Sequence, residues 1–292
     1  MVTLNVGWIG LGAMGAPMAR VVARAGHAVT AYDVDPQRSA ALAGDGIVPA
    51  MSASGAASGA DVLAIMVATP AQAESALFGD GGAAGALAAG SVVLVMSTVG
   101  PAAVRRWSAR LSEKGTSTVD APVSGGVVRA ASGDLLMMVG GAPEAVERVA
   151  PLLNAMASTA PLVGPWPGDG QKLKLVNQLL CGVHIAAAAE ALNFAESIGL
   201  DAGASWEVVR QGAAASFMLD DRGRRMVEGD FGDVKSALDI FVKDMDLVVD
   251  AAEKSGVRTM LAQAAQHAFR MGAAAGYGRM DDSSVILVYK EL

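Results

Sequence analysis

A glycine-rich turn near the start of the chain has the residue types and spacing that bind a dinucleotide. It follows an apolar stretch that predicts a buried strand, and it leads into residues 16–24, which predict a helix. In a GxGxxG turn the first glycine allows the tight turn, the second lets the backbone approach a pyrophosphate, and the third lets helix pack on strand. The pyrophosphate would bind at the helix N-terminus, where N–H groups and the helix dipole favour negative charge. The turn residues that we predict to hold the cofactor are Gly10, Leu11, Gly12, Met14 and Gly15.

An acidic residue follows the glycines at the distance that a ribose-binding carboxylate needs. Asp33 ends the second apolar stretch, about 20 residues beyond the turn, where it is placed to accept hydrogen bonds from ribose hydroxyls. Its charge would repel the 2′-phosphate of NADP, and Val34 is not the arginine that often binds that phosphate. We therefore predict NAD as the cofactor, and NADP remains the alternative because Arg38 is close in sequence.

A second set of polar residues lies at the start of a predicted helix. Lys174 and Asn177 are three residues apart, so they share a helix face. This pair suits acid–base chemistry, with Lys174 exchanging the proton and Asn177 as its orienting partner. An ordinary lysine has a pKa of about 10.4, so burial or a nearby cation such as Lys243 would have to lower it for work at neutral pH. From the residues alone, a solvated lysine on a surface helix is the alternative.

The bulk composition excludes several classes of protein. Of the 292 residues, 52% are hydrophobic, 4% are aromatic and 17% are charged, which predicts an aliphatic core and a surface partly buried in a homodimer or homotetramer. The net charge of −7 disfavours nucleic acids and anionic membranes as partners. One cysteine and three histidines make a disulfide impossible within the chain and predict no metal site. Without a visible leader or an uninterrupted apolar span, we expect a cytoplasmic protein.

The order of the predicted elements indicates an α/β fold followed by an all-α domain. Short apolar strands alternate with helices, which predicts a Rossmann-type, mainly parallel sheet covered on both faces. A Gly/Pro cluster at residues 164–170 ends this pattern, and only helices are predicted beyond it. The first of them, at residues 171–198, is so apolar that we expect it to be buried on every side. We therefore expect an NAD-binding domain at residues 1–163 and an all-α substrate and dimerisation domain at residues 164–292.

Individual elements can be assigned from the apolar pattern. The predicted strands are residues 6–9, 29–32, 62–67, 92–96, 117–119, 135–139 and 161–163. The other main predicted helices are residues 101–114, 143–153, 205–212, 239–255 and 259–275. Because ligands on such sheets bind beyond the carboxyl ends of the strands, the residues that follow each strand are the candidates for chemistry.

Four blocks of the sequence, in the same order, resemble the 3-hydroxyisobutyrate dehydrogenase family, also called the β-hydroxyacid dehydrogenases. The first runs from the glycine turn to Asp33, and the second is Asp-Ala-Pro-Val-Ser-Gly-Gly at residues 120–126. The third is Gly-x-Gly-x-x-x-Lys-x-x-Asn at residues 168–177, and the fourth is the Lys-Asp pair at residues 243–244. The resemblance covers nearly the whole chain, and it favours a catalytic role for Lys174 over a solvated one.

The resemblance implies a reversible hydride transfer between NAD and the alcohol of a small hydroxy acid, with Lys174 as the general acid/base. It also implies that Thr98 and Lys243 lie near the cofactor. Family members differ in whether the amide stands three or four residues after the lysine, and Gln178 occupies the fourth place here. The residues that it implies for substrate binding are Ser124, Gly125, Gly126, Asn177 and Lys243.

One residue of the second block points to a branch of the family. Arg129 stands where many 3-hydroxyisobutyrate enzymes have small residues, and a basic residue there resembles the branch that acts on sugar acids such as L-threonate. Arg129 would then bind a polar or anionic group of the substrate, and a surface arginine is the alternative. The other functions that we consider are an NADPH-dependent semialdehyde or imine reductase on the same scaffold and a dinucleotide-binding sensor without turnover.

Overall fold

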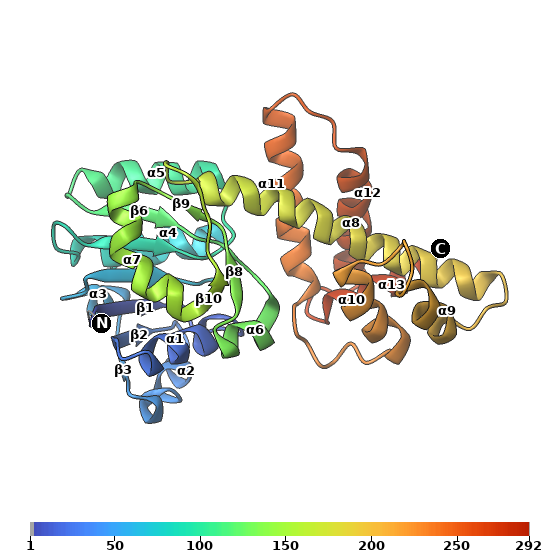
Figure 1. Ribbon diagram of the computed structural model, residues 1–292, viewed down its shortest axis with the longest axis horizontal. Coiled ribbons are helices and arrows are strands. Elements are labelled where there is room, and N and C mark those ends of the chain that lie inside the picture. The colour runs from blue at the N-terminus through green and yellow to red at the C-terminus, as the bar shows by residue number, and fades with distance from the viewer. Residues whose placement is uncertain (1–2, 292) are drawn as a thin grey trace. The chain divides into compact units, whose positions relative to one another are not determined.

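The computed structural model describes residues 3–291, which form two compact units (Figure 1). One unit extends to Lys174 and the other begins at Leu175, so the division falls within one long helix. The boundary expected from the sequence, between residues 163 and 164, lies at the end of the last strand instead.

The first unit is built on an eight-stranded sheet. Its strand order is β11-β9-β6-β5-β4-β1-β2-β3, and all neighbouring pairs are parallel except β6 and β9. The strand order reverses between β1 and β4, the point where doubly wound sheets bind their ligands. The strands are β1 Asn5–Ile9, β2 Ala28–Tyr32, β3 Ile47–Pro49, β4 Val62–Ile65, β5 Val92–Val95, β6 Ser117–Asp120, β9 Val139–Gly140 and β11 Leu162–Gly164.

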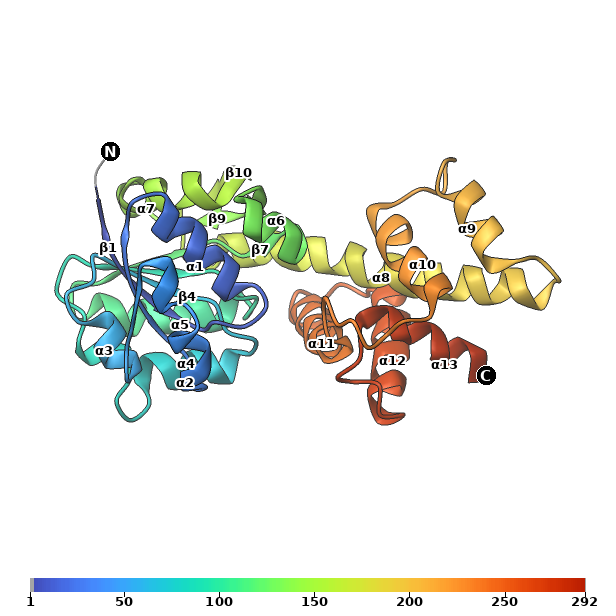
Figure 2. The same ribbon diagram turned by 90° about the horizontal axis from the view of Figure 1, so that it is seen from below.

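Helices cover both faces of this sheet, as the alternation of strands and helices predicts. Successive residues of a strand point to opposite faces, and in β4 Ala64 packs in one apolar cluster while Leu63 and Ile65 pack in another. Helices α1 and α7 contribute to the first cluster and α3, α4 and α5 to the second (Figure 2). The helices of this unit are α1 Gly15–Arg24, α2 Pro36–Ala40, α3 Ala53–Ala57, α4 Pro70–Phe78, α5 Pro101–Ser112, α6 Gly126–Ser132 and α7 Pro143–Met156, with short 3-10 turns at Ala43–Asp45 and Ala83–Gly85.

A small second sheet departs from the prediction. The expected strand at residues 135–139 is two strands, β8 Leu135–Met137 and β9, which belong to different sheets. β8 pairs with β7 Val123–Ser124 and β10 Ala157–Thr159. The apolar run is continuous because both halves are buried, so its hydrophobicity does not reveal the division.

The elements of the second unit are all helical within residues 175–291, and loops connect them. Its core holds Phe241 and Phe269, whose rings stack with centroids 5.2 Å apart, and the aliphatic residues around them. The helix α10 is absent from the prediction, although Ser216 caps its start and Gly229 ends it in the left-handed conformation. The elements are α8 Asp169–Ser197, which begins in the first unit, α9 Ala202–Val209, α10 Phe217–Glu228, α11 Leu238–Lys254, α12 Met260–Ala274, the 3-10 turn η3 Asp282–Val285 and α13 Ile286–Glu291.

Helix α8 is only partly buried, contrary to the sequence expectation. By length and composition alone it could cross a membrane, but 44% of its most apolar window is buried inside the protein. Ile185 and Ala189 lie in the core of the second unit, whereas Leu180 and Phe194 are exposed. The alanine-rich middle of the helix makes it apolar all round, but its side chains do not all face this chain's core.

A buried ionic cluster joins α10 to η3. Arg222 donates to both carboxylate oxygens of Asp282 at 3.0 Å, and Arg225 donates to Asp281. Both carboxylates are inaccessible to solvent. Burial raises the pKa of Asp282, while Arg222 opposes that shift.

Removing one partner of this pair should destabilise the fold strongly. Arg222→Met leaves the Asp282 carboxylate buried without its cation, which costs about 3–5 kcal/mol of unfolding free energy in comparable pairs. The loss should shrink as the pH is lowered, because a protonated Asp282 carries no charge. Denaturant unfolding measures both effects. Arg224→Met is the matched control, since Arg224 is exposed on the same helix and pairs with Glu228, and it should cost less than about 1 kcal/mol. Equal losses in the two variants would contradict this account.

Candidate active site

The glycine turn lies at the point where the strand order reverses. Gly10 follows β1 with a φ of +95°, and a Cβ atom there would lie 2.2 Å from the carbonyl oxygen of Met66, which follows β4. A Cβ on Gly15 would lie 2.0 Å from the carbonyl oxygen of Gly10. Both positions therefore require glycine, one because two loops meet and the other because α1 starts directly against the turn.

The start of α1 suits an anionic ligand. No side-chain hydrogen bond caps this helix among the described residues, and its first turn holds no acidic residue. The N–H groups at a helix start favour negative charge. The residues present therefore fit a dinucleotide pyrophosphate.

Asp33 is tied to the glycine turn by its carboxylate. Its Oδ2 atom accepts from the N–H of Leu11 at 2.7 Å, and its Oδ1 atom accepts from the N–H of Asp35 at 2.9 Å. The side chain is buried, and Arg38 approaches it with 3.8 Å between Nη1 and Oδ2. Asp33 thus holds the end of β2 against the turn that follows β1, and Arg38 is directed toward two carboxylates, those of Asp33 and Asp35.

The next loop along the sheet edge carries Ser97 and Thr98, after β5. The hydroxyl of Ser97 accepts from the N–H of Val67 at 2.7 Å, which joins the loops that follow β4 and β5. Thr98 is half-buried beside it. This loop is therefore fixed at the carboxyl end of the parallel strands, where the sequence places a cofactor contact.

The Ser-Gly-Gly turn leads from β7 into α6. Gly125 and Gly126 both have positive φ, +139° and +73°, and a Cβ on Gly125 would lie 3.0 Å from the Cβ of Arg129. Arg129 is partly exposed and forms an ion pair with Asp134, with 3.0 Å between Nε and Oδ2. The turn thus needs glycine at both places, and Arg129 already has one anionic partner in this chain.

The head of α8 is hydrogen-bonded to the end of β6, a feature that the sequence analysis missed. The carboxylate of Asp120 is inaccessible to solvent, and it accepts from the N–H of Gly168 at 2.6 Å and of Gln171 at 2.7 Å. Burial raises the pKa of Asp120 to about 7, although these two hydrogen bonds oppose the rise. Asp120 stands first in the second family-like block, which is the signal that could have singled it out.

Gln171 makes a second connection between α8 and the sheet edge. Its Oε1 atom accepts from the N–H groups of Val99 at 2.9 Å and Gly100 at 3.0 Å, and its Nε2 atom donates to the carbonyl oxygen of Ser97 at 2.9 Å. Lys174 lies three residues after Gln171 on the same helix, and 6% of its surface is exposed. This value favours the buried lysine over the solvated one that the sequence left open.

Polar residues of the second unit form a network on α8 and α11. Asn177 donates from Nδ2 to Oε1 of Gln178 at 2.8 Å, and Gln178 donates from Nε2 to Oδ2 of Asp244. The Nζ atom of Lys243 lies 2.7 Å from Oδ1 of Asp244. The network brings Asn177 and Lys243, both implied by the family resemblance, into one connected group.

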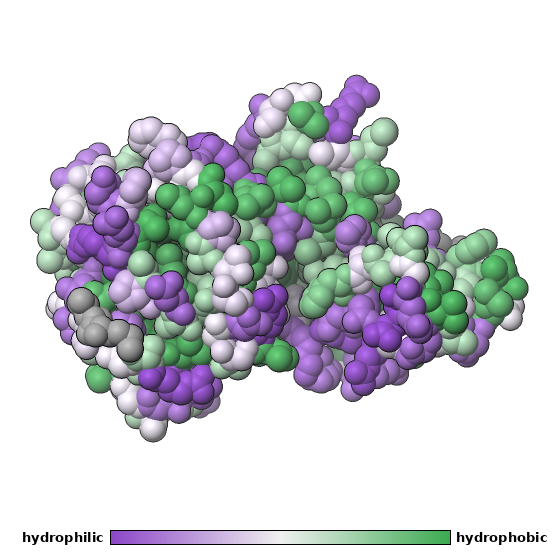
Figure 3. Space-filling view, viewed as in Figure 1, coloured by the Kyte–Doolittle hydropathy of each residue, from purple (hydrophilic) through white to green (hydrophobic). Residues whose placement is uncertain are grey.

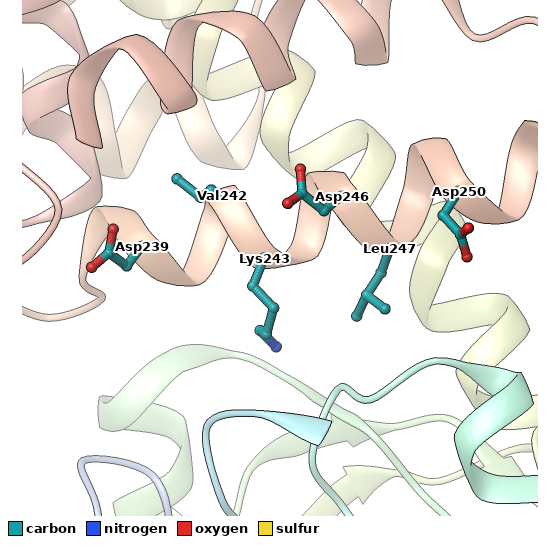
Figure 4. Close-up of a pocket in the computed structure, with 6 residues that line it drawn as sticks. All are labelled: Asp239, Val242, Lys243, Asp246, Leu247 and Asp250. Carbon is teal, nitrogen blue, oxygen red and sulfur yellow. The ribbon is translucent and has the colours of Figure 1, made fainter. Parts of the chain in front are cut away.

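Lys243 also lines a hollow along α11. Figure 4 shows Lys243 and Leu247 projecting from the same side of this helix, as residues four apart do. The hollow has a volume of about 510 Å³.

Among residues 3–291, no group of three or more His, Cys, Asp or Glu side chains could hold a metal ion.

Comparison with known proteins identifies the relatives of this chain. The NAD-binding domain of 6-phosphogluconate dehydrogenase matches residues 5–164, and the NAD-binding domain of NADP-dependent 3-hydroxyisobutyrate dehydrogenase matches residues 168–289. An L-threonate dehydrogenase of Cupriavidus necator is 41% identical over 98% of this chain and 96% of its own length. A 2-hydroxy-3-oxopropionate reductase of Escherichia coli is 34% identical over 97% of this chain and 96% of its own length.

The fold agrees with these relatives. The crystal structure of a 3-hydroxyisobutyrate dehydrogenase from Salmonella typhimurium matches 97% of this chain and 99% of that chain, with a TM-score of 0.91 and 40% identity. The motifs, the Rossmann-type sheet and the helical unit that begins with α8 therefore lead to one conclusion: the chain belongs to the 3-hydroxyisobutyrate dehydrogenase family of NAD(P)-dependent hydroxyacid dehydrogenases, as the sequence predicts.

Proposed function

We propose that this enzyme oxidises the alcohol of a small sugar acid of the L-threonate type with NAD, and that Lys174 is its general acid/base. The observation that carries the proposal is the burial of Lys174 just beyond Gln171, whose side chain is bonded to the loop that follows β5. A buried lysine near the carboxyl ends of the strands stands at the edge of the sheet that also carries the glycine turn.

The substrate class rests on two observations. The similarity to an L-threonate dehydrogenase extends over nearly the whole chain. Ser124 leads into a turn in which Gly125 and Gly126 have positive φ values, and successive backbone N–H groups of a turn can bind an anion, here the substrate carboxylate. Arg129 would bind a further polar group of the sugar acid, in competition with its ion pair to Asp134.

In the proposed reaction, a side chain of the protein exchanges the hydroxyl proton of the substrate. The nicotinamide ring, when bound, accepts the hydride that leaves the alcohol carbon. In its neutral form Lys174 accepts the hydroxyl proton at Nζ, and in the reverse direction its ammonium returns that proton to the carbonyl oxygen. Asn177 and Lys243 would contact the substrate, and Thr98 would contact the cofactor.

Replacing Lys174 tests the assigned role. Lys174→Ala should lower kcat by about 10²-fold or more while the Kd for NADH stays near the wild-type value, because only the proton-transfer group is removed. Turnover is followed by NADH absorbance with L-threonate, 3-hydroxyisobutyrate, glycerate, 4-hydroxybutyrate and L-serine. The control is Lys172→Ala, since Lys172 is exposed and pairs with Asp169. Near-normal turnover in Lys174→Ala would contradict the role, and wild-type NADH binding without turnover on any substrate would favour a sensor.

The cofactor preference is a separate part of the proposal. Asp33 is buried against the turn that would hold the pyrophosphate, so the 2′-phosphate of NADP would meet its charge. We therefore propose NAD, with Arg38 as the residue that tempers the preference because it lies 3.8 Å from this carboxylate.

A charge change at Asp33 should alter the ratio of kcat/KM for NAD to that for NADP. Wild type should prefer NAD, and Asp33→Asn should reduce the ratio by about tenfold or more, because a hydrogen bond to a charged group contributes about 1.5–3 kcal/mol and each 1.4 kcal/mol is tenfold. Asp45→Asn is the control, since Asp45 is exposed and pairs with Arg20 rather than with Arg38. An unchanged ratio in Asp33→Asn would remove Asp33 from the specificity determinants.

We also propose that α8 packs against a second copy of the chain in a homodimer or homotetramer. Figure 3 shows hydrophobic surface where α8 passes into α9, a region that includes exposed Ile198, Leu200 and Val208. In a dimer with a two-fold axis, the same apolar patch of both copies would be buried in the contact. The exposed apolar residues along α8 and just beyond it are spaced three or four positions apart, with one gap of seven between Leu180 and Ala187: Leu173, Val176, Leu180, Ala187, Ala191, Phe194 and Ile198.

A charge within this apolar stripe should dissociate the assembly. Phe194→Glu would place a carboxylate in an apolar contact, so sedimentation velocity should show a smaller species than wild type. Met51→Glu is the control, because Met51 is the most exposed large apolar residue among residues 3–174 and is not part of α8. A wild-type monomer, or an assembly that Phe194→Glu leaves intact, would contradict the proposal.

A further inference from the structure

We propose that Asp120 and Gln171 are positioning residues that fix the head of α8 on the sheet edge and thereby set where Lys174 lies. The inference rests on the proposed role of Lys174 and extends it to two residues that do not react. All the contacts that carry it lie within the first unit.

Asp120 supplies the first part of this connection. Its two carboxylate oxygens accept from two N–H groups of one helix start, those of Gly168 and Gln171. A carboxylate at that end also has a favourable interaction with the helix dipole. Because β6 is paired to its neighbours on both sides, these hydrogen bonds attach the start of α8 to the sheet itself and not to a surface loop.

Three glycine-dependent contacts leave this joint little room to move. A Cβ on Gly170 would lie 2.1 Å from the carbonyl oxygen of Met138, and a Cβ on Gly140 would lie 2.5 Å from the N atom of Gly170. A Cβ on Gly168 would lie 3.0 Å from the carbonyl oxygen of Pro101. The backbone of the helix head therefore packs directly on the backbone of the sheet edge, which is the arrangement that a fixed position requires.

Gln171 supplies the second part and joins two predicted site elements. Its amide uses both ends, accepting from two N–H groups and donating to one carbonyl oxygen of the 97–100 loop. That loop contains Thr98, which the family resemblance implies as a cofactor contact. The side chain of Gln171 thus links the 97–100 loop to the helix that carries Lys174. Since a misplacement of about 1 Å can cost about 10²-fold in rate, this link bears on the chemistry.

Substitutions at the two residues test the inference through the split between kcat and binding. Asp120→Asn keeps the shape of the side chain but directs an NH₂ group at one of the two backbone N–H donors. Gln171→Met removes all three hydrogen bonds of the side-chain amide. Each should lower kcat by about tenfold or more, and Asp120→Asn should leave the Kd for NADH within about threefold of wild type. The kcat of the double variant should be little lower than that of the worse single variant, because both substitutions weaken the same attachment of α8 to the sheet edge. Thr118→Val is the control.

Thr118 is a matched control because it lies two residues before Asp120 on the same strand. It is buried, and its hydroxyl has no hydrogen-bond partner within residues 3–291. Thr118→Val should therefore leave kcat unchanged. Wild-type kcat in both Asp120→Asn and Gln171→Met, or fully multiplicative losses in the double variant, would overturn the inference. If Asp120→Asn does not fold, Gln171→Met alone decides, since it leaves the Asp120 bonds in place.

A measurement without substrate separates this inference from the proposed function. Burial holds the folded pKa of Asp120 near 7, above its ordinary value, so the native state keeps a proton that the unfolded chain releases. Asp169 is the nearby ionisable group that adds to this shift, and it is itself paired with Lys172. The melting temperature of wild type and Thr118→Val should carry a component that falls from about pH 4 to pH 7, and Asp120→Asn should lose it.

Amide hydrogen exchange gives the second readout that needs no turnover. Exchange at residues 168–174 should be faster in Asp120→Asn and Gln171→Met than in Thr118→Val. Unchanged exchange in both variants would show that the joint does not hold the helix head. Failure of the wild type to turn over any hydroxy acid would instead overturn the proposed function while leaving the joint itself measurable.

Discussion

The structure depends on one buried carboxylate that meets a helix start. Asp120 ends a central strand and accepts the N–H groups of Gly168 and Gln171, so the long helix α8 leaves the sheet at a fixed place. A buried carboxylate is costly when it is ionised, and burial raises its pKa to about 7. The two short N–H contacts offset part of that cost, which makes the helix start and the carboxylate depend on each other.

Close backbone approach is the second constraint, and it explains why glycine recurs in the motifs. At Gly10 and Gly15 the turn, the first helix and the loop after β4 meet with no space for a Cβ atom. At Gly170 the same condition holds between α8 and the carbonyl oxygen of Met138. The first pair shapes the turn that we propose to bind the pyrophosphate, whereas Gly170 lets a helix start pack directly on the sheet edge.

Much of the fold could be predicted because the burial of one face or both faces of an element leaves a characteristic pattern of apolar residues in the sequence. The central strands are continuous apolar runs, and the expected parallel sheet is confirmed, with the pair β6 and β9 as its antiparallel exception. Local capping was harder to anticipate. Asp201 starts α9 at Ala202, three residues before the predicted start at residue 205. The helix α10 is rich in charged residues and buries only Leu219, Gly223 and Met226, so its Ser216 and Gly229 caps mark it more clearly than its apolar pattern does.

The sequence offers candidate site residues where a motif fixes the backbone, but it does not reveal contacts between side chains that meet only through the fold. Nothing local in the sequence joins Asp120 to Gly168, because the contact forms only once β6 and α8 are placed. The choice between Asn177 and Gln178 as the amide that the family resemblance pairs with Lys174 shows the same limit. Gln178 is held by Asp244, which fixes its Nε2 atom toward the carboxylate and its Oε1 atom toward Asn177. Because the Nδ2 group of Asn177 is then directed to Gln178 and Cys181, a substrate that meets this side chain would meet its carbonyl oxygen. A ligand bound there would therefore have to donate a hydrogen bond, as the hydroxyl of a sugar acid does.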